Sequence, residues 1–218
     1  TGYPFVTLKM AQSLDGKIAA PSGESRWISS VPARRFVHRL RARADAVLVG
    51  KNTALQDNPR LQAKAHEEKP WRVVLDPDLE LSRNARIFKG SPLTFVAVSE
   101  KKLPKLSNLS NRNGRILIPV SEKKGRLELK DLLRQLGFLG INDLLVEGGG
   151  EVAWSLIQER LVDRLLWIVA PKIIGGRSTK TSVEGEGIDK LEKAFLLKWE
   201  KVSRLGEDWV FEAKPRPK

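Results

Sequence analysis

Three consecutive glycines after an apolar run are the feature of this sequence best suited to chemistry. Residues 144–146 predict a buried strand, and glycines 148–150 lead from it into a helix. This arrangement holds phosphate in α/β proteins, because glycines let the backbone approach the anion and the helix N-terminus offers free N–H groups. The turn lacks the GxGxxG pattern, and Glu151 in the first helical turn would itself complement the helix dipole. Phosphate binding and a tight strand-to-helix turn therefore both stay open.

Further candidates for a site are one carboxylate, one lysine and one tryptophan. Glu147 stands at the carboxyl end of the strand before the glycines, where ligands bind in open sheets. It suits hydrogen bonds to the amino groups of a heterocycle, but an N-cap or a surface ion pair explains it equally well. Lys9 lies in an apolar run, where a sheet edge or a solvent-facing side chain is the commoner explanation. Trp27 could stack on a flat ring, although a core tryptophan is the more common case.

Two other glycine positions resemble the first. Gly50 ends the apolar run 46–49 and is followed by Thr53 and Asp57. From residue type alone, these two are best explained as a helix cap and an Asx turn. The Gly-Gly pair at 175–176 follows two isoleucines, and it either approaches a ligand or simply turns the chain.

Composition limits the chemistry available to the 218 residues. Cysteine is absent and histidine occurs only at His38 and His66, which argues against a disulfide framework or a metal centre. We expect His38 to be structural or on the surface, and His66 to be solvated. The net charge of +13 favours anionic partners, including phosphorylated small molecules, but a basic surface explains it as well, and no nucleic-acid-binding motif is present. No apolar run approaches the ~20 residues of a membrane span and no secretory signal occurs, so we expect a cytoplasmic protein without a membrane partner.

Alternating strand and helix patterns predict an α/β fold with a mostly parallel sheet and an antiparallel edge. Strands are predicted at residues 5–10, 46–49, 72–75, 93–98, 115–118, 144–146 and 165–170, helices at 32–43, 128–136 and 152–161, and a final hairpin at 198–202 and 209–213. Ser30 is expected to cap the first helix, and Gly137 to stop the second. Residues 101–114 predict a polar loop. Without repeats or low-complexity tracts, one domain is the simplest organisation.

Several motifs, taken in order, are more informative than any single residue. They are the runs 8–19 (LKMAQSLDGKIA), 23–29 (GESRWIS), 45–50 (DAVLVG), 57–59 (DNP), 146–149 (VEGG) and 170–176 (APKIIGG). From about Tyr3 to the final strand, the chain resembles the reductase domain of the bifunctional riboflavin biosynthesis deaminase/reductase family. The resemblance implies a dihydrofolate-reductase-like fold, with a central mostly parallel mixed sheet flanked by helices. It also implies NADPH-dependent reduction of 5-amino-6-(5-phosphoribosylamino)uracil to 5-amino-6-(5-phosphoribitylamino)uracil.

The resemblance further assigns residues to ligands. The substrate residues it implies are Lys9, Ser25, Arg41, Leu61 and Glu147, of which Lys9 and Glu147 are the catalytic candidates. The NADPH residues it implies are Ala11, Trp27, Ser29, Gly50, Thr53, Asp57 and the segment of Gly148, Gly149, Gly150, Glu151 and Val152 that continues to Ser155. Lys64 stands where the bacterial bifunctional enzymes usually have an arginine. It keeps the charge for the substrate phosphate but loses the bidentate fork of arginine.

The resemblance implies a homodimer, and it implies that residues 1–218 are one reductase domain. The Thr1 start fits a piece from the C-terminal side of a longer chain with a deaminase domain, although a stand-alone reductase is an alternative. The loop at residues 99–102 is a candidate for recognising the 2′-phosphate of NADPH. Two other functions stay open: a reductase of the same fold that acts on folate or a related pteridine, and a non-catalytic basic module that binds nucleic acid.

Overall fold

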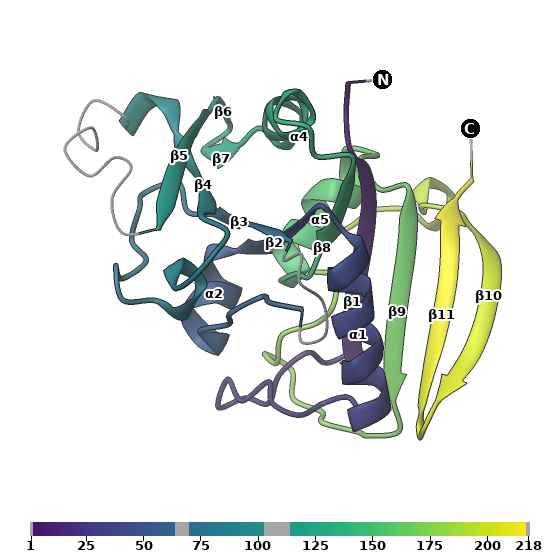
Figure 1. Ribbon diagram of the computed structural model, residues 1–218. Coiled ribbons are helices and arrows are strands. Elements are labelled where there is room, and N and C mark those ends of the chain that lie inside the picture. The colour runs from purple at the N-terminus through teal and green to yellow at the C-terminus, as the bar shows by residue number, and fades with distance from the viewer. Residues whose placement is uncertain (1, 64–69, 103–113, 217–218) are drawn as a thin grey trace. The chain divides into compact units, whose positions relative to one another are not determined.

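The computed structural model describes residues 2–63, 70–102 and 114–216, and the chain forms two compact units. The first unit contains Thr1–Phe5 and His38–Leu145, and the second contains Val6–Val37 and Val146–Lys218. Helix α1 (Val31–Arg43) contains one of the boundaries between them. Each unit has its own strands and its own buried apolar residues, and Figure 1 shows the elements of both.

Parallel strands form the centre of the first unit. They are β2 (Ala46–Gly50), β3 (Trp71–Leu75), β4 (Thr94–Ser99) and β5 (Arg115–Val120), which pair in that order, with β8 (Asp143–Val146) next to β2. Every residue of β2 and β4 is buried, which is why these strands appear in the sequence as continuous apolar runs. Because the strands run in one direction, the residues that follow them gather at one edge of the sheet.

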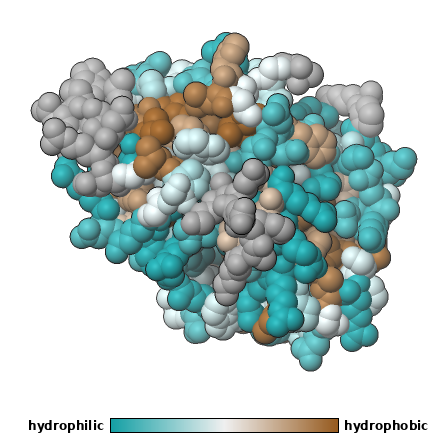
Figure 2. Space-filling view, viewed as in Figure 1, coloured by the Kyte–Doolittle hydropathy of each residue, from teal (hydrophilic) through white to brown (hydrophobic). Residues whose placement is uncertain are grey.

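Short elements surround these strands. Helix α2 (Lys51–Asp57) follows β2 directly, and 3-10 turns occur at Arg86–Phe88 and Glu100–Lys102. The strands β6 (Glu122–Lys123) and β7 (Arg126–Leu127) form a small hairpin before α4 (Leu129–Phe138). Helix α4 buries leucines at helical spacing, namely Leu129, Leu132, Leu133 and Leu136. In Figure 2, hydrophobic residues gather over β5 and this hairpin, on a face that is otherwise mostly hydrophilic.

The second unit combines one parallel and two antiparallel strand pairs. Its strand order is β10 (Leu197–Leu205), β11 (Asp208–Pro215), β9 (Arg164–Ala170) and β1 (Phe5–Ser13). β1 and β9 are parallel, whereas β11 is antiparallel to both of its neighbours. Helix α5 (Gly150–Gln158) and a 3-10 turn at Leu191–Lys193 complete the regular elements. The C-terminal hairpin is the yellow pair of strands in Figure 1.

The predicted fold class is confirmed. The sheet strands are mostly parallel, and the last two form an antiparallel hairpin around Gly206. Ser30 caps α1 as predicted, because its Oγ accepts a hydrogen bond from the Ala33 N–H at 3.5 Å. His38 is structural, with its Nδ1 atom 3.2 Å from the Gln62 carbonyl oxygen. Of the predicted polar loop 101–114, residues 103–113 lie outside the described part of the chain.

The predicted bounds of two helices are wrong, each for a local reason. Gly137 does not stop its helix, which continues to Phe138; a Cβ atom at Gly137 would collide with the Gly2 carbonyl oxygen, so glycine serves close packing there. The helix predicted at 152–161 instead spans Gly150–Gln158. It begins earlier because Gly149 is the N-cap, and it ends earlier because the chain turns into a left-handed conformation at Arg160, with φ of 57°.

Candidate functional site

Lys9 and Glu147 form a largely buried ion pair in the second unit. Lys9 Nζ lies 3.6 Å from Glu147 Oε2, and the two side chains are only 13% and 8% exposed. Lys9 is on β1, and Glu147 directly follows β8. A solvent-facing Lys9 is therefore the wrong explanation, and so is a surface ion pair for Glu147. Because both side chains are largely shielded from solvent, removing one of the two charges is expected to destabilise the charge that remains.

The glycine-rich turn leads from Glu147 into α5. Gly148 and Gly149 have φ of +83° and +79°, in the left-handed region that favours glycine. Gly149 is the N-cap of α5, so Glu147 is not, and no side chain caps this helix. An uncapped helix N-terminus beside a strand end is where an anion can be held. The phosphate-binding interpretation of this turn stays a prediction.

Gly150 is required by packing rather than by its backbone conformation. A Cβ atom there would lie 2.5 Å from both Glu184 Cγ and the Thr181 carbonyl oxygen, and the Glu184 N–H donates to the Gly150 carbonyl at 3.1 Å. Glu151 and Val152 follow in the first turn of α5, the former exposed and the latter half-buried. The segment 181–184 therefore fixes where α5 begins.

Trp27 is an exposed aromatic platform rather than a core residue. It is 63% exposed, and the Arg34 guanidinium carbon lies 4.2 Å from its ring centroid. Arg34 also donates a hydrogen bond of 2.6 Å to the Ser29 carbonyl, and Lys172 Nζ donates one of 2.7 Å to the Trp27 carbonyl. A tryptophan held from one face by a cation can offer its other face to a planar ring. Ser25 and Ser29, predicted to contact ligands, are half-buried in the same loop.

Most of the remaining predicted residues lie in the first unit. Gly50 is the N-cap of α2, so Thr53 is not a helix cap, and Asp57 is the last residue of this helix rather than an Asx turn. Leu61 is buried in the core of this unit, 3% exposed and with φ of 51°. Arg41, in the last turn of α1, is half-buried. The predicted phosphate residue Lys64 and the solvated His66 lie outside the described residues.

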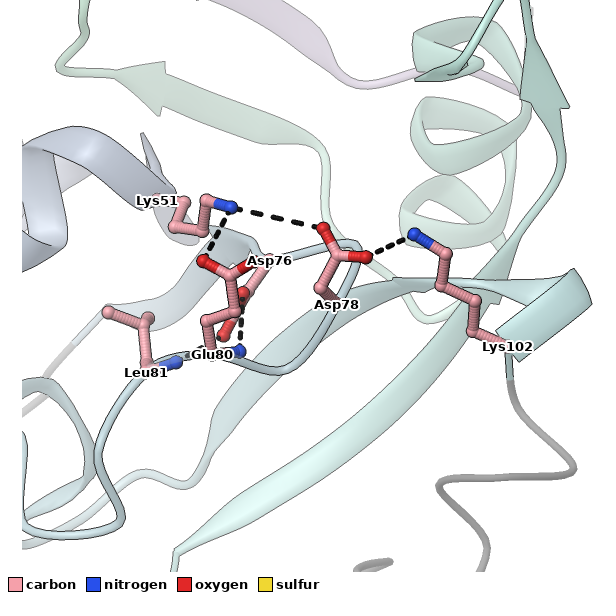
Figure 3. Close-up of polar contacts among 6 residues, drawn as sticks. All are labelled: Lys51, Asp76, Asp78, Glu80, Leu81 and Lys102. Atoms are coloured by element: carbon pink, nitrogen blue, oxygen red, sulfur yellow. Dashed lines mark hydrogen bonds and ion pairs between the residues drawn. The ribbon is translucent and has the colours of Figure 1, made fainter.

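Charged residues follow β2, β3 and β4 at their carboxyl ends, and Figure 3 shows the polar contacts among them. Lys51 Nζ lies 2.8 Å from Glu80 and 3.9 Å from Asp78, and Lys102 also pairs with Asp78. The Glu80 hydrogen bond raises the pKa of Lys51, and the hydrogen bond from Lys102 lowers the pKa of Asp78. Lys102 belongs to the predicted 2′-phosphate loop. Its ammonium group is thus already matched with a carboxylate.

The same cluster contains a fully buried carboxylate that sequence analysis overlooked. Asp76 accepts hydrogen bonds from the N–H groups of Glu80 and Leu81 at 3.0 and 2.9 Å. Burial nevertheless raises the pKa of Asp76 above its usual value. The sequence signal was an apolar strand followed immediately by Asp-Pro-Asp, at the edge where open sheets bind ligands.

A hollow of the first unit lies at the amino ends of β2 and β3. Its volume is about 390 Å³, and its lining is Ala42, Arg43, Ala44, Asp45, Pro70, Trp71 and Gly140. None of the described residues predicted for ligands lines it, so it is not the candidate site. In the described ranges, no three histidine or carboxylate residues are grouped to hold a metal ion. No described helix is long and apolar enough to cross a membrane.

The fold and the site together define a general class of protein. The class is an α/β protein with a buried lysine–glutamate pair beside an uncapped helix N-terminus. The chain belongs to the family described as the RibD C-terminal domain, whose model matches residues 4–211. The predicted family is thereby confirmed.

Named relatives are similar over nearly the whole chain. The riboflavin biosynthesis protein RibD of Aquifex aeolicus is 37% identical over 209 residues, which are 95% of this chain and 56% of that protein. The 2,5-diamino-6-ribosylamino-4(3H)-pyrimidinone 5′-phosphate reductase of Methanothermobacter thermautotrophicus is 36% identical over 96% of this chain and 97% of its own length. The structure of Acinetobacter baumannii RibD (form 1) matches all of this chain and 59% of that one, with a TM-score of 0.84 and 29% identity. The chain thus spans little more than half of the RibD relatives.

Proposed function

We propose that the protein is an NADPH-dependent reductase of a phosphorylated ribosylamino-pyrimidine in riboflavin biosynthesis. The observation that carries the proposal is the Lys9–Glu147 pair directly before the uncapped start of α5. The two named relatives support it, since one is a riboflavin biosynthesis protein and the other a pyrimidinone phosphate reductase.

NADPH fits the residues of the second unit. The N-terminus of α5 is suited to a phosphate of the dinucleotide, and the exposed ring of Trp27 to one of its flat rings. Gly50, Thr53 and Asp57 remain proposed cofactor residues of the first unit. When bound, NADPH supplies the hydride that reduces the sugar carbon.

Lys9 and Glu147 have different roles in the proposed reaction. Reduction requires the ribosylamino ring to open, so a proton has to move at the ring oxygen. We assign this transfer to the Lys9 ammonium group. Glu147 keeps Lys9 in place and accepts hydrogen bonds from the amino groups of the pyrimidine. Ser25 and Leu61 complete the proposed substrate contacts, and Arg41 and Lys64 are proposed to hold the 5′-phosphate.

The decisive assay is NADPH oxidation by the purified chain with two pyrimidine phosphates. One is 5-amino-6-(5-phosphoribosylamino)uracil, our proposed substrate, and the other is the 2,5-diamino pyrimidinone named for the Methanothermobacter relative. Oxidation that depends on the uracil and is much slower with NADH is the expected result. NADPH binding without oxidation of either compound would contradict the substrate, and dihydrofolate would be tested next. Absence of NADPH binding, with salt-dependent binding to nucleic acid, would favour the basic-module alternative.

We also propose a homodimer that uses the C-terminal hairpin. Trp199 and Trp209 are 62% and 48% exposed, and Val202, paired with Phe211, is 49% exposed. Paired residues share a face of a sheet, as do alternate residues of one strand, so these side chains form one apolar surface. Aromatic residues gathered on a surface in this way are typical of protein interfaces.

Val202→Glu is expected to convert the dimer into a monomer of 24.4 kDa. A carboxylate in the centre of an apolar interface would be desolvated without a partner, which disfavours association. The measurement is light scattering after size exclusion. Lys201→Gln is the control, because residue 201 pairs with Glu212 on the other face of the hairpin, and this variant should stay dimeric. A monomeric wild type, or a dimeric Val202→Glu, would contradict the proposed interface.

A further inference from the structure

Asp15 joins two segments of the second unit that are far apart in sequence. Its carboxylate accepts hydrogen bonds from the Ile174 N–H at 3.1 Å, the Gly175 N–H at 2.7 Å and the Ser13 hydroxyl at 2.5 Å. The Ser13 hydroxyl oxygen in turn accepts a hydrogen bond from the Lys17 N–H at 2.9 Å. The turn after β1 is thus tied to the segment after β9.

The segment held by Asp15 also reaches Trp27. Lys172 accepts a hydrogen bond from the Leu14 N–H at its carbonyl, at 2.8 Å, and donates one from Nζ to the Trp27 carbonyl at 2.7 Å. Hydrogen bonds at both ends, and the backbone of residues 172–175 between them, therefore connect Asp15 with Trp27. A substitution of Asp15 is therefore expected to disturb the position of Trp27, the aromatic platform.

Residues 171–176 have few other means of holding their conformation. They contain no helix or strand, and Ile173 is 71% exposed. Gly175 and Gly176 have φ of +72° and +88°, and glycine is the residue with the most conformational freedom to lose. A Cβ atom at Gly176 would collide with Thr179 Oγ1, so this glycine serves the turn itself. Such a segment depends on a few side-chain hydrogen bonds.

We propose that Asp15 is a positioning residue that, through residues 171–176, holds Trp27 in place for the cofactor. The inference rests on the proposed function, because it takes Trp27 as a contact of NADPH. In this proposal Asp15 has no contact of its own with the cofactor or the substrate. It acts by fixing the segment from which Lys172 holds the loop of Trp27.

The charge of Asp15 persists throughout the pH range of an enzyme assay. The hydrogen bond from Ser13, followed by that from Gly175, lowers the pKa of Asp15 to about 2. Because the pKa of Asp15 in the folded protein lies below its usual value of 3.8, the stabilisation is complete above that value and is lost as the pH falls towards 2. The hydrogen bonds that the Asp15 carboxylate accepts therefore do not change with pH near neutrality.

The test is Asp15→Asn, which keeps the shape of the side chain but replaces one acceptor oxygen with a donor. We expect hydrogen exchange to accelerate at residues 171–176 and around Trp27. The KM for NADPH should rise about ten-fold, while kcat at saturating NADPH and the KM for the pyrimidine stay within about two-fold. Asp189→Asn, in an exposed ion pair with Lys193, is the matched control and should change none of these values.

Lys172→Gln provides a second variant that leaves the carboxylate intact. If Asp15 acts through residues 171–176, the double variant should raise the KM for NADPH no more than the stronger single variant does. Additive effects, or unchanged exchange at Trp27 in Asp15→Asn, would overturn the proposal. If the wild type fails to bind NADPH, the proposed function fails instead, and accelerated exchange at Trp27 still decides whether Asp15 positions it.

Discussion

Replacing Lys9 with alanine is expected to lower kcat by about 10²–10⁴-fold, the usual contribution of a positioned proton donor. NADPH affinity should change little, because Lys9 is assigned to the substrate and stands against Glu147. Single-turnover oxidation of NADPH, together with direct measurement of NADPH binding, separates these two effects. Turnover close to that of the wild type would contradict the catalytic role of Lys9.

Two further variants separate proton transfer from charge and from folding. Lys9→Arg keeps the positive charge beside Glu147 but does not release a proton near neutral pH, so it should fold normally and remain slow. Lys9→Ala leaves Glu147 buried without this partner, which can destabilise the fold. The double variant Lys9→Ala with Glu147→Gln removes both charges. It is expected to recover thermal stability but not turnover, and recovery of turnover would assign the loss to folding.

Gly185→Ala is expected to destabilise the second unit by about 3 kcal/mol or more, the sum of a left-handed backbone strain and a collision in the core. Gly185 has φ of +79°, and a Cβ atom there would fall on the indole ring of Trp154. Trp154 is 6% exposed and packs edge-on against Phe195 at 6.0 Å, so it has little room to move. Because Trp154 belongs to α5, the change should also weaken NADPH binding.

Gly187→Ala is the matched control for that effect. Gly187 has φ of +70°, but nothing lies within 4 Å of where its Cβ atom would be. Only the backbone strain should then appear, at about 1–2 kcal/mol. Urea unfolding measures both free energies of unfolding. Equal losses in the two variants would show that contact with Trp154 contributes nothing.

Much of the fold could be predicted because its signals are local. The strand β2 is buried on both faces and appears as a continuous apolar run, and α4 shows its leucines at helical spacing. Helix α2 could not be predicted in this way. It has seven residues, of which only Ala54 is buried, so it carries no apolar periodicity. Its N-cap is a glycine, which offers no capping side chain to recognise.

The site could be predicted only in part, because its geometry depends on pairings between distant residues. Lys9 and Glu147 were both identified as candidates, but their ion pair follows from where β1 and the end of β8 place them. The common preference of tryptophan for the core led to the wrong expectation at Trp27, whose exposure is set by Arg34 and Lys172. Asp15 appeared only within the motif 8–19. Its two amide partners belong to a segment that no local pattern connects with it.

The division of the chain between the two units sets an order in which they can fold. The first unit consists almost entirely of the continuous stretch His38–Leu145, whereas the second needs Val6–Val37 and Val146–Lys218 together. Val6, for example, donates its N–H to Asp163, 157 residues away. During synthesis from the N-terminus, β1 is made long before its partner strand β9. It therefore cannot pair with β9 until the first unit has been completed. Closing so long a loop is slow, so assembly of the second unit, and with it the Lys9–Glu147 pair, is expected to be the late step of folding.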